Sequence, residues 1–133
     1  MSNFIKKSPF RRDFSPLNDN IANKTAVTKV TLSMESGYSA DVNEVYYMGN
    51  ETATGVIHVF GTIRIWGTYV SGWTNDIGTI NRAPQTECLI PLLNATSGIF
   101  AGMISIKATG KISIYNSTGA TLSNARVAAV IAY

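Results

Sequence analysis

The segment 102–115 alternates apolar and polar residues, and this pattern constrains the fold more than any other part of the chain. A period of two places four isoleucines on one face of a β-hairpin and the polar residues on the other face. Gly110 can adopt the positive φ that a short hairpin loop requires. The segment therefore predicts a surface hairpin over an apolar core. The four isoleucines are Ile104, Ile106, Ile112 and Ile114.

The following segment, 125–133, is apolar in both of its alternating sets. One set holds larger side chains, from Val127 to Tyr133, and the other holds Ala128, Val130 and Ala132. Such a strand lies in the centre of a sandwich, or another subunit covers one of its faces. We also expect the chain end at Tyr133 to be tied into the sheet by this strand.

Five segments between residues 26 and 108, the last of which contains the first strand of the hairpin, have the apolar alternation and the turn residues that are typical of strands, and none shows a helical period. A glycine at 61 and another at 67 indicate a bulge or bend that could divide the longest strand. Residues 71–84 read as a long loop. The pattern predicts an all-β fold, an antiparallel β-sandwich of jelly-roll type. The segments are 26–34, 42–48, 56–70, 87–93 and 99–108.

Residues 1–24 differ in composition from the rest of the chain. They carry five basic and two acidic residues and account for the whole net charge of +3, so residues 25–133 are neutral. Two prolines and irregular apolar spacing predict an extended arm, and its phenylalanines indicate that the arm orders on a partner. We expect residues 1–24 to anchor a head domain, 25–133. The anchoring candidates are Phe4, Phe10, Arg11, Arg12 and Phe14.

The same segment gives a weak signal for nucleic acid, so we do not expect a nucleic-acid partner. No run of 18 apolar residues predicts a membrane span, and we expect no membrane insertion. The N-terminal residues lack the apolar core of a signal peptide, which predicts assembly in a cytoplasm.

Catalytic and metal-binding signals are sparse. The chain has one histidine, His58, and one cysteine, Cys88, which lies in an apolar run typical of a buried, inert thiol. We expect no metal, no cofactor and no enzyme activity. A Cys88–His58 pair and two carboxylate pairs of the kind used for glycoside cleavage stay open as an enzyme alternative. The carboxylate pairs are Glu44 with Glu51, and Asp76 with Glu87.

The segment 66–76 concentrates two tryptophans and a tyrosine beside Asn and Asp. Aromatic rings stack on the C–H face of a sugar, and Asn or Asp side chains bond its hydroxyl groups, so the segment predicts a saccharide site. The alternative is that these rings pack under the loop or against another subunit. The saccharide candidates are Trp66, Tyr69, Trp73, Asn75 and Asp76.

A second candidate surface is an interface between copies of the chain. His58 and Arg64 lie on the same strand face as Trp66 and could line a symmetric contact. The small residues Ala128, Val130 and Ala132 are expected to join them there.

The pair of Gly-x-Ile-x-Ile segments, 102–106 and 110–114, with the apolar final strand 126–133 and the irregular N-terminal arm, resembles the head domains of bacteriophage tail-fibre and receptor-binding proteins. The resemblance covers residues 25–133. It implies a homotrimer of jelly-roll or similar heads, carried on a virion, that binds host-surface saccharides or proteins. Other virion proteins would hold the arm.

The chain departs from that family because no long fibre shaft precedes the head. This departure leaves open a capsid-decoration or tail and baseplate component with no receptor-binding role. A free-standing lectin-like module is a further alternative.

Overall fold

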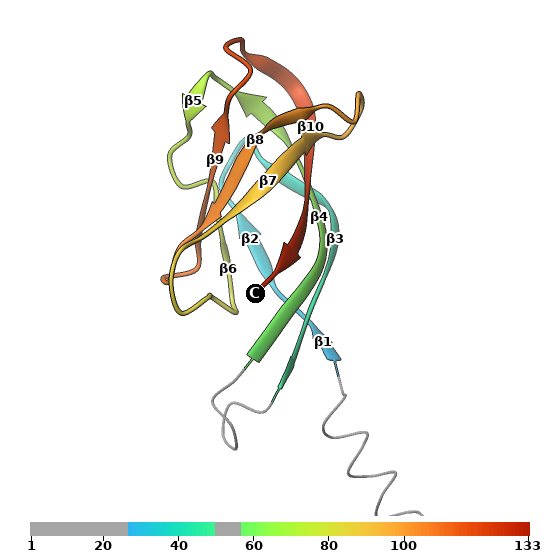
Figure 1. Ribbon diagram of the computed structural model, residues 1–133, viewed down its shortest axis with the longest axis vertical. Coiled ribbons are helices and arrows are strands. Elements are labelled where there is room, and N and C mark those ends of the chain that lie inside the picture. Colours follow the sequence, from blue (N-terminus) through green and yellow to red (C-terminus); the bar gives the residue numbers. More distant parts are fainter. Residues whose placement is uncertain (1–26, 50–56) are drawn as a thin grey trace, which may run out of the picture.

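The structure, a computed structural model, describes residues 27–49 and 57–133, and the strands in these residues form one antiparallel sheet without a helix (Figure 1). This confirms the prediction of an all-β fold. The anchoring arm, with Phe4, Phe10, Arg11, Arg12 and Phe14, lies outside the described residues, as does Glu51 of the carboxylate pair Glu44 and Glu51. The strands are β1 (Val27–Lys29), β2 (Leu32–Met34), β3 (Ser39–Gly49), β4 (Ile57–Tyr69), β5 (Gly72–Trp73), β6 (Gly78–Ile80), β7 (Cys88–Asn94), β8 (Phe100–Ile106), β9 (Lys111–Asn116) and β10 (Leu122–Ala132).

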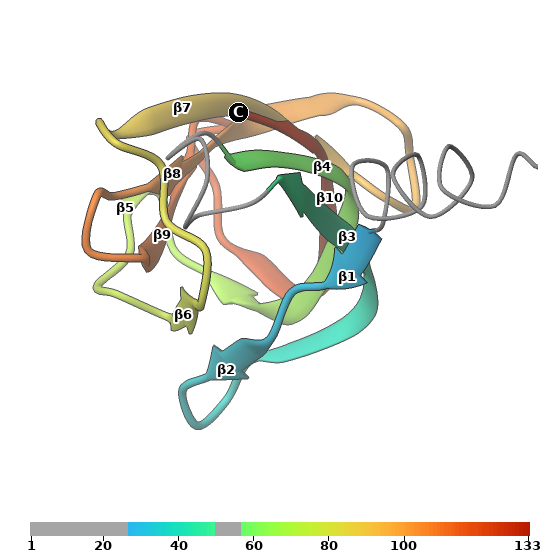
Figure 2. The same cartoon turned by 90° about the horizontal axis from the view of Figure 1, so that it is seen from below.

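The sheet curls into a half-barrel with the strand order β1-β3-β4-β10-β7-β8-β9-β6-β2, and β5 pairs with β9 beside this path (Figure 2). The described strands thus belong to one continuous sheet. The jelly-roll type and the trimer stay predictions.

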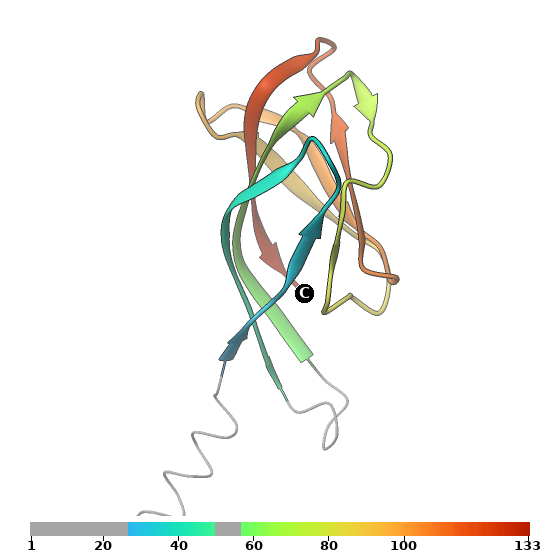
Figure 3. The same cartoon turned by 180° about the vertical axis from the view of Figure 1, so that it is seen from behind.

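The segment Val27–Met34 connects the two edges of the sheet. Its first half, β1, pairs with β3, and its second half, β2, pairs with β6 (Figure 3). Between them, the Val30 amide donates to the Val45 carbonyl, whereas the Thr31 amide donates to Asn81 Oδ1. The sequence predicted one strand here, and the structure divides it because the chain changes its bonding partner at this point.

The core lies on the concave side of the sheet, and the β8–β9 hairpin supplies much of it. All four isoleucines of the hairpin are buried, and Gly110 has a φ of +86°, which confirms the predicted hairpin. Ser105 and Ser113, which pair across the hairpin, are buried as well although they face away from the isoleucines. The polar face of the hairpin is therefore covered in part.

Strand β4 runs unbroken from Ile57 to Tyr69, so the predicted division at its glycines is wrong. Gly61 lies opposite Val45 of β3 in an unbroken register, and its φ is +140°. A Cβ atom at this position would lie 1.9 Å from the Glu44 carbonyl oxygen. Glycine therefore permits a close approach of the two strands rather than a break.

The final strand, β10, is central in the sheet, between β4 and β7. It begins at Leu122 rather than at residue 125, and Val127, Ala129 and Ile131 point into the core. Tyr133 exchanges two backbone hydrogen bonds with Val59, which fixes the chain end to β4 as expected. The prediction of one loop over 71–84 is wrong, since β5 and β6 form within it.

Candidate functional site

The structure separates the three aromatic residues of the segment 66–76. Trp66 lies half-buried on the outer face of β4, opposite Arg126 of β10. Tyr69 lies in the core, and Trp73 lies on β5, opposite Tyr115 of β9. The three side chains thus do not form one saccharide platform.

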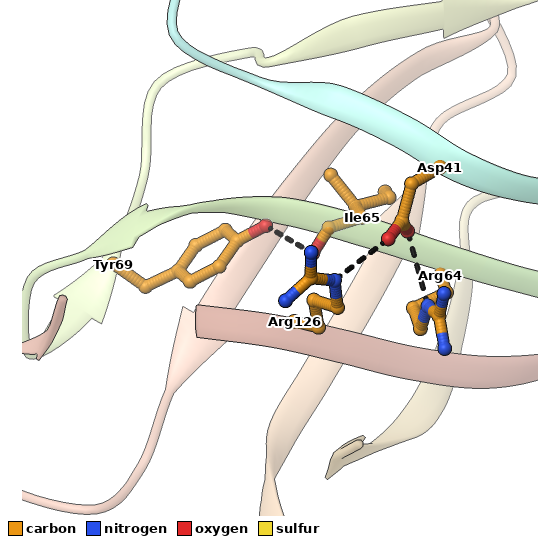
Figure 4. Close-up of polar contacts among 5 residues, drawn as sticks. All are labelled: Asp41, Arg64, Ile65, Tyr69 and Arg126. Atoms are coloured by element: carbon orange, nitrogen blue, oxygen red, sulfur yellow. Dashed lines mark hydrogen bonds and ion pairs between the residues drawn. The ribbon is translucent and has the colours of Figure 1, made fainter. Parts of the chain in front are cut away.

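Tyr69 is corrected from a candidate ligand residue to a core residue. Its side chain is 0% exposed, and its hydroxyl group donates to the Ile65 carbonyl at 2.9 Å (Figure 4). Burial raises the pKa of Tyr69, with smaller contributions from Tyr38 and Asp41. A phenol in this position has no access to a ligand on the surface.

The surroundings of Trp66 are dominated by an ion cluster on the outer face. Asp41, at a bulge in β3, accepts from Arg64 Nε at 3.1 Å and from Arg126 Nε at 2.8 Å (Figure 4). Desolvation of Asp41 opposes its ionisation, but the hydrogen bonds from Arg64 and Arg126 outweigh it and lower the pKa of the carboxyl group. The cluster joins β3, β4 and β10 and leaves Arg64, a predicted interface residue, paired within its own chain.

Trp73 forms the aromatic wall of a groove of about 360 Å³ beside the hairpin. Its ring is 48% exposed and packs against Tyr115, with the ring centroids 5.2 Å apart. This groove, which we call the Trp73 groove, is lined by Trp73, Thr74, Glu87, Ser105, Lys107 and Ser113.

Polar groups in the Trp73 groove are held in place by contacts among themselves. Ser105 Oγ donates to Glu87 Oε2 at 2.8 Å, and Lys107 Nζ lies 2.9 Å from Asp76 Oδ1. Thr74 Oγ1 accepts from the Ile114 amide of β9, which fixes the loop that carries Trp73. The strands of the hairpin thus supply a rigid polar floor, and β5 supplies the aromatic wall.

The structure brings part of the predicted saccharide set together. Trp73 lines the groove, Asp76 contacts its Lys107, and Asn75 is exposed between them in the sequence. The sequence did not assign the remaining lining residues to this site, although it offered Glu87 with Asp76 as a carboxylate pair. The alternation in the hairpin placed Ser105, Lys107 and Ser113 on one polar face, and that shared face was the available signal.

The structure separates Cys88 from His58 but brings Asp76 and Glu87 to one groove. The burial alternation of β7 places Cys88 on the side of Leu92, half-buried, and His58 is exposed on the outer face of β4. Asp76 and Glu87 both border the Trp73 groove through their contacts with Lys107 and Ser105. Among residues 27–49 and 57–133, no group of three or more His, Cys, Asp or Glu side chains could hold a metal ion.

The outer face around β10 is apolar and uncovered in the single chain. Val130 is 71% exposed, and the neighbouring strand β7 exposes Leu89 and Leu93. Within the described strands, β10 pairs with β7 only through Val127 and Ala128, and the two strands then diverge (Figure 1). A hollow of about 450 Å³ lies at this point, and we call it the β7–β10 hollow. Its lining is Thr62, Ile90, Pro91, Leu93, Ala128, Ala129 and Val130.

All five predicted interface residues lie on β4 or β10. The register pairs Ala128 with Arg64, and Ala132 with the exposed Phe60. His58, two residues before Phe60, is exposed near the same end. The strand pairing therefore brings these residues to one continuous surface.

In the part of the chain that the structure describes, no helix is long and apolar enough to cross a membrane. The chain matches no protein-family model and no curated protein.

Proposed function

We propose that this chain is a non-enzymatic virion subunit of a bacteriophage, a fibre or spike head that recognises a host-surface saccharide in the Trp73 groove. One observation carries the saccharide part of the proposal. An exposed indole ring, backed by Tyr115, stands beside a floor of carboxylate, ammonium and hydroxyl groups. Sugar sites combine these two kinds of surface because a sugar ring has an apolar C–H face and a rim of hydroxyl groups.

The dimensions of the groove support the same reading. Its volume of about 360 Å³ falls within the range of about 300–1,000 Å³ that is typical of small-molecule sites. Its polar side chains are already held by hydrogen bonds, so a ligand would order few groups on binding.

The virion part of the proposal rests on the sequence resemblance to phage head domains. The basic, phenylalanine-bearing residues 1–24 would hold the head to other virion proteins, and assembly would take place in the host cytoplasm. We further propose that the head is a homotrimer with jelly-roll-type packing. The apolar outer face of β10 and β7 supports an assembly of copies, since a monomer rarely exposes so many large apolar side chains together.

Replacing Trp73 with alanine is expected to weaken saccharide binding by about 10- to 100-fold, because the stacking surface of the groove is lost. Binding is measured on a glycan array and then by calorimetry with the best ligand. The melting temperature should change little, since Trp73 is half exposed on a short strand.

Trp66→Ala is the matched control, because it removes the same ring from the outer face of β4. It should leave saccharide affinity within about twofold of the parent value. Equal losses in the two variants, or no binding by the parent chain to any glycan or host cell, would contradict the saccharide proposal.

The alternative function is a capsid-decoration or tail and baseplate component without a receptor. The exposed apolar face favours it, since that face serves assembly whether or not a receptor exists. Under this alternative, particles carrying Trp73→Ala adsorb to the host as well as parent particles do.

The trimer is tested at the centre of the apolar face. Light scattering should give three times the 14.3 kDa of one chain, and Val130→Asp should shift the mass to that of a single chain. A charge placed in an apolar interface loses its hydration without gaining a partner, so the copies separate. The control is Thr121→Asp, an exposed position before β10, which should leave the trimer intact. A parent protein that is monomeric at every concentration rules the trimer out.

A further inference from the structure

We infer that the Trp73 groove selects neutral saccharides and rejects those that carry a carboxylate or sulfate, an inference that rests on the saccharide site proposed above. The starting point is the charge of the groove. Its lining holds one carboxylate, that of Glu87, and one ammonium group, that of Lys107, and Asp76 pairs with Lys107 at the border of the groove. These three formal charges sum to −1.

The positive charge in the groove is already matched. Lys107 Nζ lies 2.9 Å from Asp76 Oδ1, and both side chains are less than half exposed. To bind an acidic sugar, Lys107 would have to leave Asp76 or share its charge between two anions. The contact with Asp76 thus lowers the attraction that a lysine would otherwise offer to an anionic ligand.

The negative charge of Glu87 is not matched in the same way. No Lys or Arg of residues 27–49 and 57–133 forms an ion pair with it. One of its oxygens, Oε2, accepts from Ser105 Oγ, and this bond holds the carboxylate at the floor of the groove. The second oxygen, Oε1, can accept from a ligand, so Glu87 acts as a fixed acceptor of hydrogen bonds.

A neutral sugar suits this arrangement. Its hydroxyl groups donate to Glu87 while its C–H face stacks on Trp73. Thr74 Oγ1 accepts from the Ile114 amide, and its O–H group can still donate to an oxygen of the sugar. A carboxylated or sulfated sugar would instead bring a second negative charge close to Glu87, and like charges at such distances lower affinity.

The experiment compares matched ligands on the full chain. Oligosaccharides of glucose, galactose and mannose are each paired with the uronic acid in which C6 is oxidised to a carboxylate, and sulfated forms are added. We expect the neutral member of the bound pair to bind at least about tenfold more tightly than its acidic counterpart at low salt. This difference in affinity should become smaller as the salt concentration is raised, since salt screens the repulsion between the ligand and Glu87.

Glu87→Gln identifies the source of the selectivity. It keeps the shape of the side chain and an oxygen that can accept from Ser105, but it removes the charge. The variant should bind the uronic acid more tightly than the parent does, so that most of the difference in affinity between the neutral and the acidic saccharide disappears. Glu44→Gln, which removes a carboxylate on β3, a strand that contributes no residue to the lining of the groove, should leave this difference in affinity unchanged.

The outcomes separate the two proposals. If acidic saccharides bind as tightly as neutral ones and Trp73→Ala abolishes both, the saccharide site stands and the inference of neutral selectivity is wrong. If Glu87→Gln leaves the preference unchanged, the assignment of selectivity to Glu87 is wrong. If no saccharide of either kind binds, the saccharide proposal itself fails.

Discussion

Replacing Gly61 with alanine is expected to lower the free energy of unfolding by about 4 kcal/mol. A Cβ atom at this position would lie 1.9 Å from the Glu44 carbonyl oxygen and 2.8 Å from the Val45 Cα atom. Both atoms belong to the backbone of β3, so no side-chain rotation relieves the clash. The φ of +140° adds strain for any residue with a Cβ atom. Chemical denaturation of the parent and the variant measures the loss.

The matched control is Gly37→Ala, in the turn between β2 and β3. Gly37 also has a positive φ, +93°, but nothing lies within 4 Å of its added Cβ atom. This variant should lose only the cost of the backbone conformation, about 1 kcal/mol. Similar losses in both variants would show that the close approach of β3 and β4 at Gly61 does not exist in solution.

Asn116→Ala is expected to cost about 3 kcal/mol of stability, because several buried polar groups lose their partner at once. Asn116 is 1% exposed, and its Nδ2 donates to the Tyr69 carbonyl at 2.9 Å and to the Ala120 carbonyl at 2.8 Å. Its Oδ1 accepts from both the amide and the hydroxyl group of Thr118. The side chain thus joins the end of β4 to the turn before β10, and thermal unfolding measures the loss.

Asn94→Ala serves as the comparison. Asn94 Oδ1 also accepts two hydrogen bonds, from the backbone amides of Thr96 and Ser97, but these bonds are exposed to water. Solvent replaces the lost bonds there, so the expected cost is about 1 kcal/mol. If Asn94→Ala destabilised the protein more than Asn116→Ala, burial would not explain the difference.

Alternation within single strands was enough to predict the hairpin and the two faces of β10. The same alternation also indicated that Tyr69 is buried. The buried set of β4 runs through Val59, Ile63 and Ile65, and its phase reaches position 69. The aromatic composition of the segment 66–76 favours a saccharide site, whereas this phase favours packing of Tyr69 in the core. The structure agrees with the phase, which bears out the packing alternative for Tyr69.

The Trp73 groove could be predicted only in part, because its residues come together through long-range pairing. Trp73 reaches the hairpin through the pairing of β5 with β9. Glu87, one residue before β7, reaches Ser105 through the pairing of β7 with β8. A local period assigns a residue to a face but does not say which strand lies beside it. The partition of the segment Val27–Met34 between two edges was beyond prediction for the same reason.

That segment also sets the order in which the protein can fold. Only residues 30–38, which include β2, separate β1 from β3, so we expect their pairing to form early by closing a short loop. The Thr31 amide, one residue before β2, can form its hydrogen bond only after Asn81, 50 residues further along the chain, has come into place. The ion pair that ties β3 to β10 spans 85 residues. We therefore expect closure of the sheet by Val27–Met34 to be late and slow, and until it occurs both edges are open to strands of neighbouring chains.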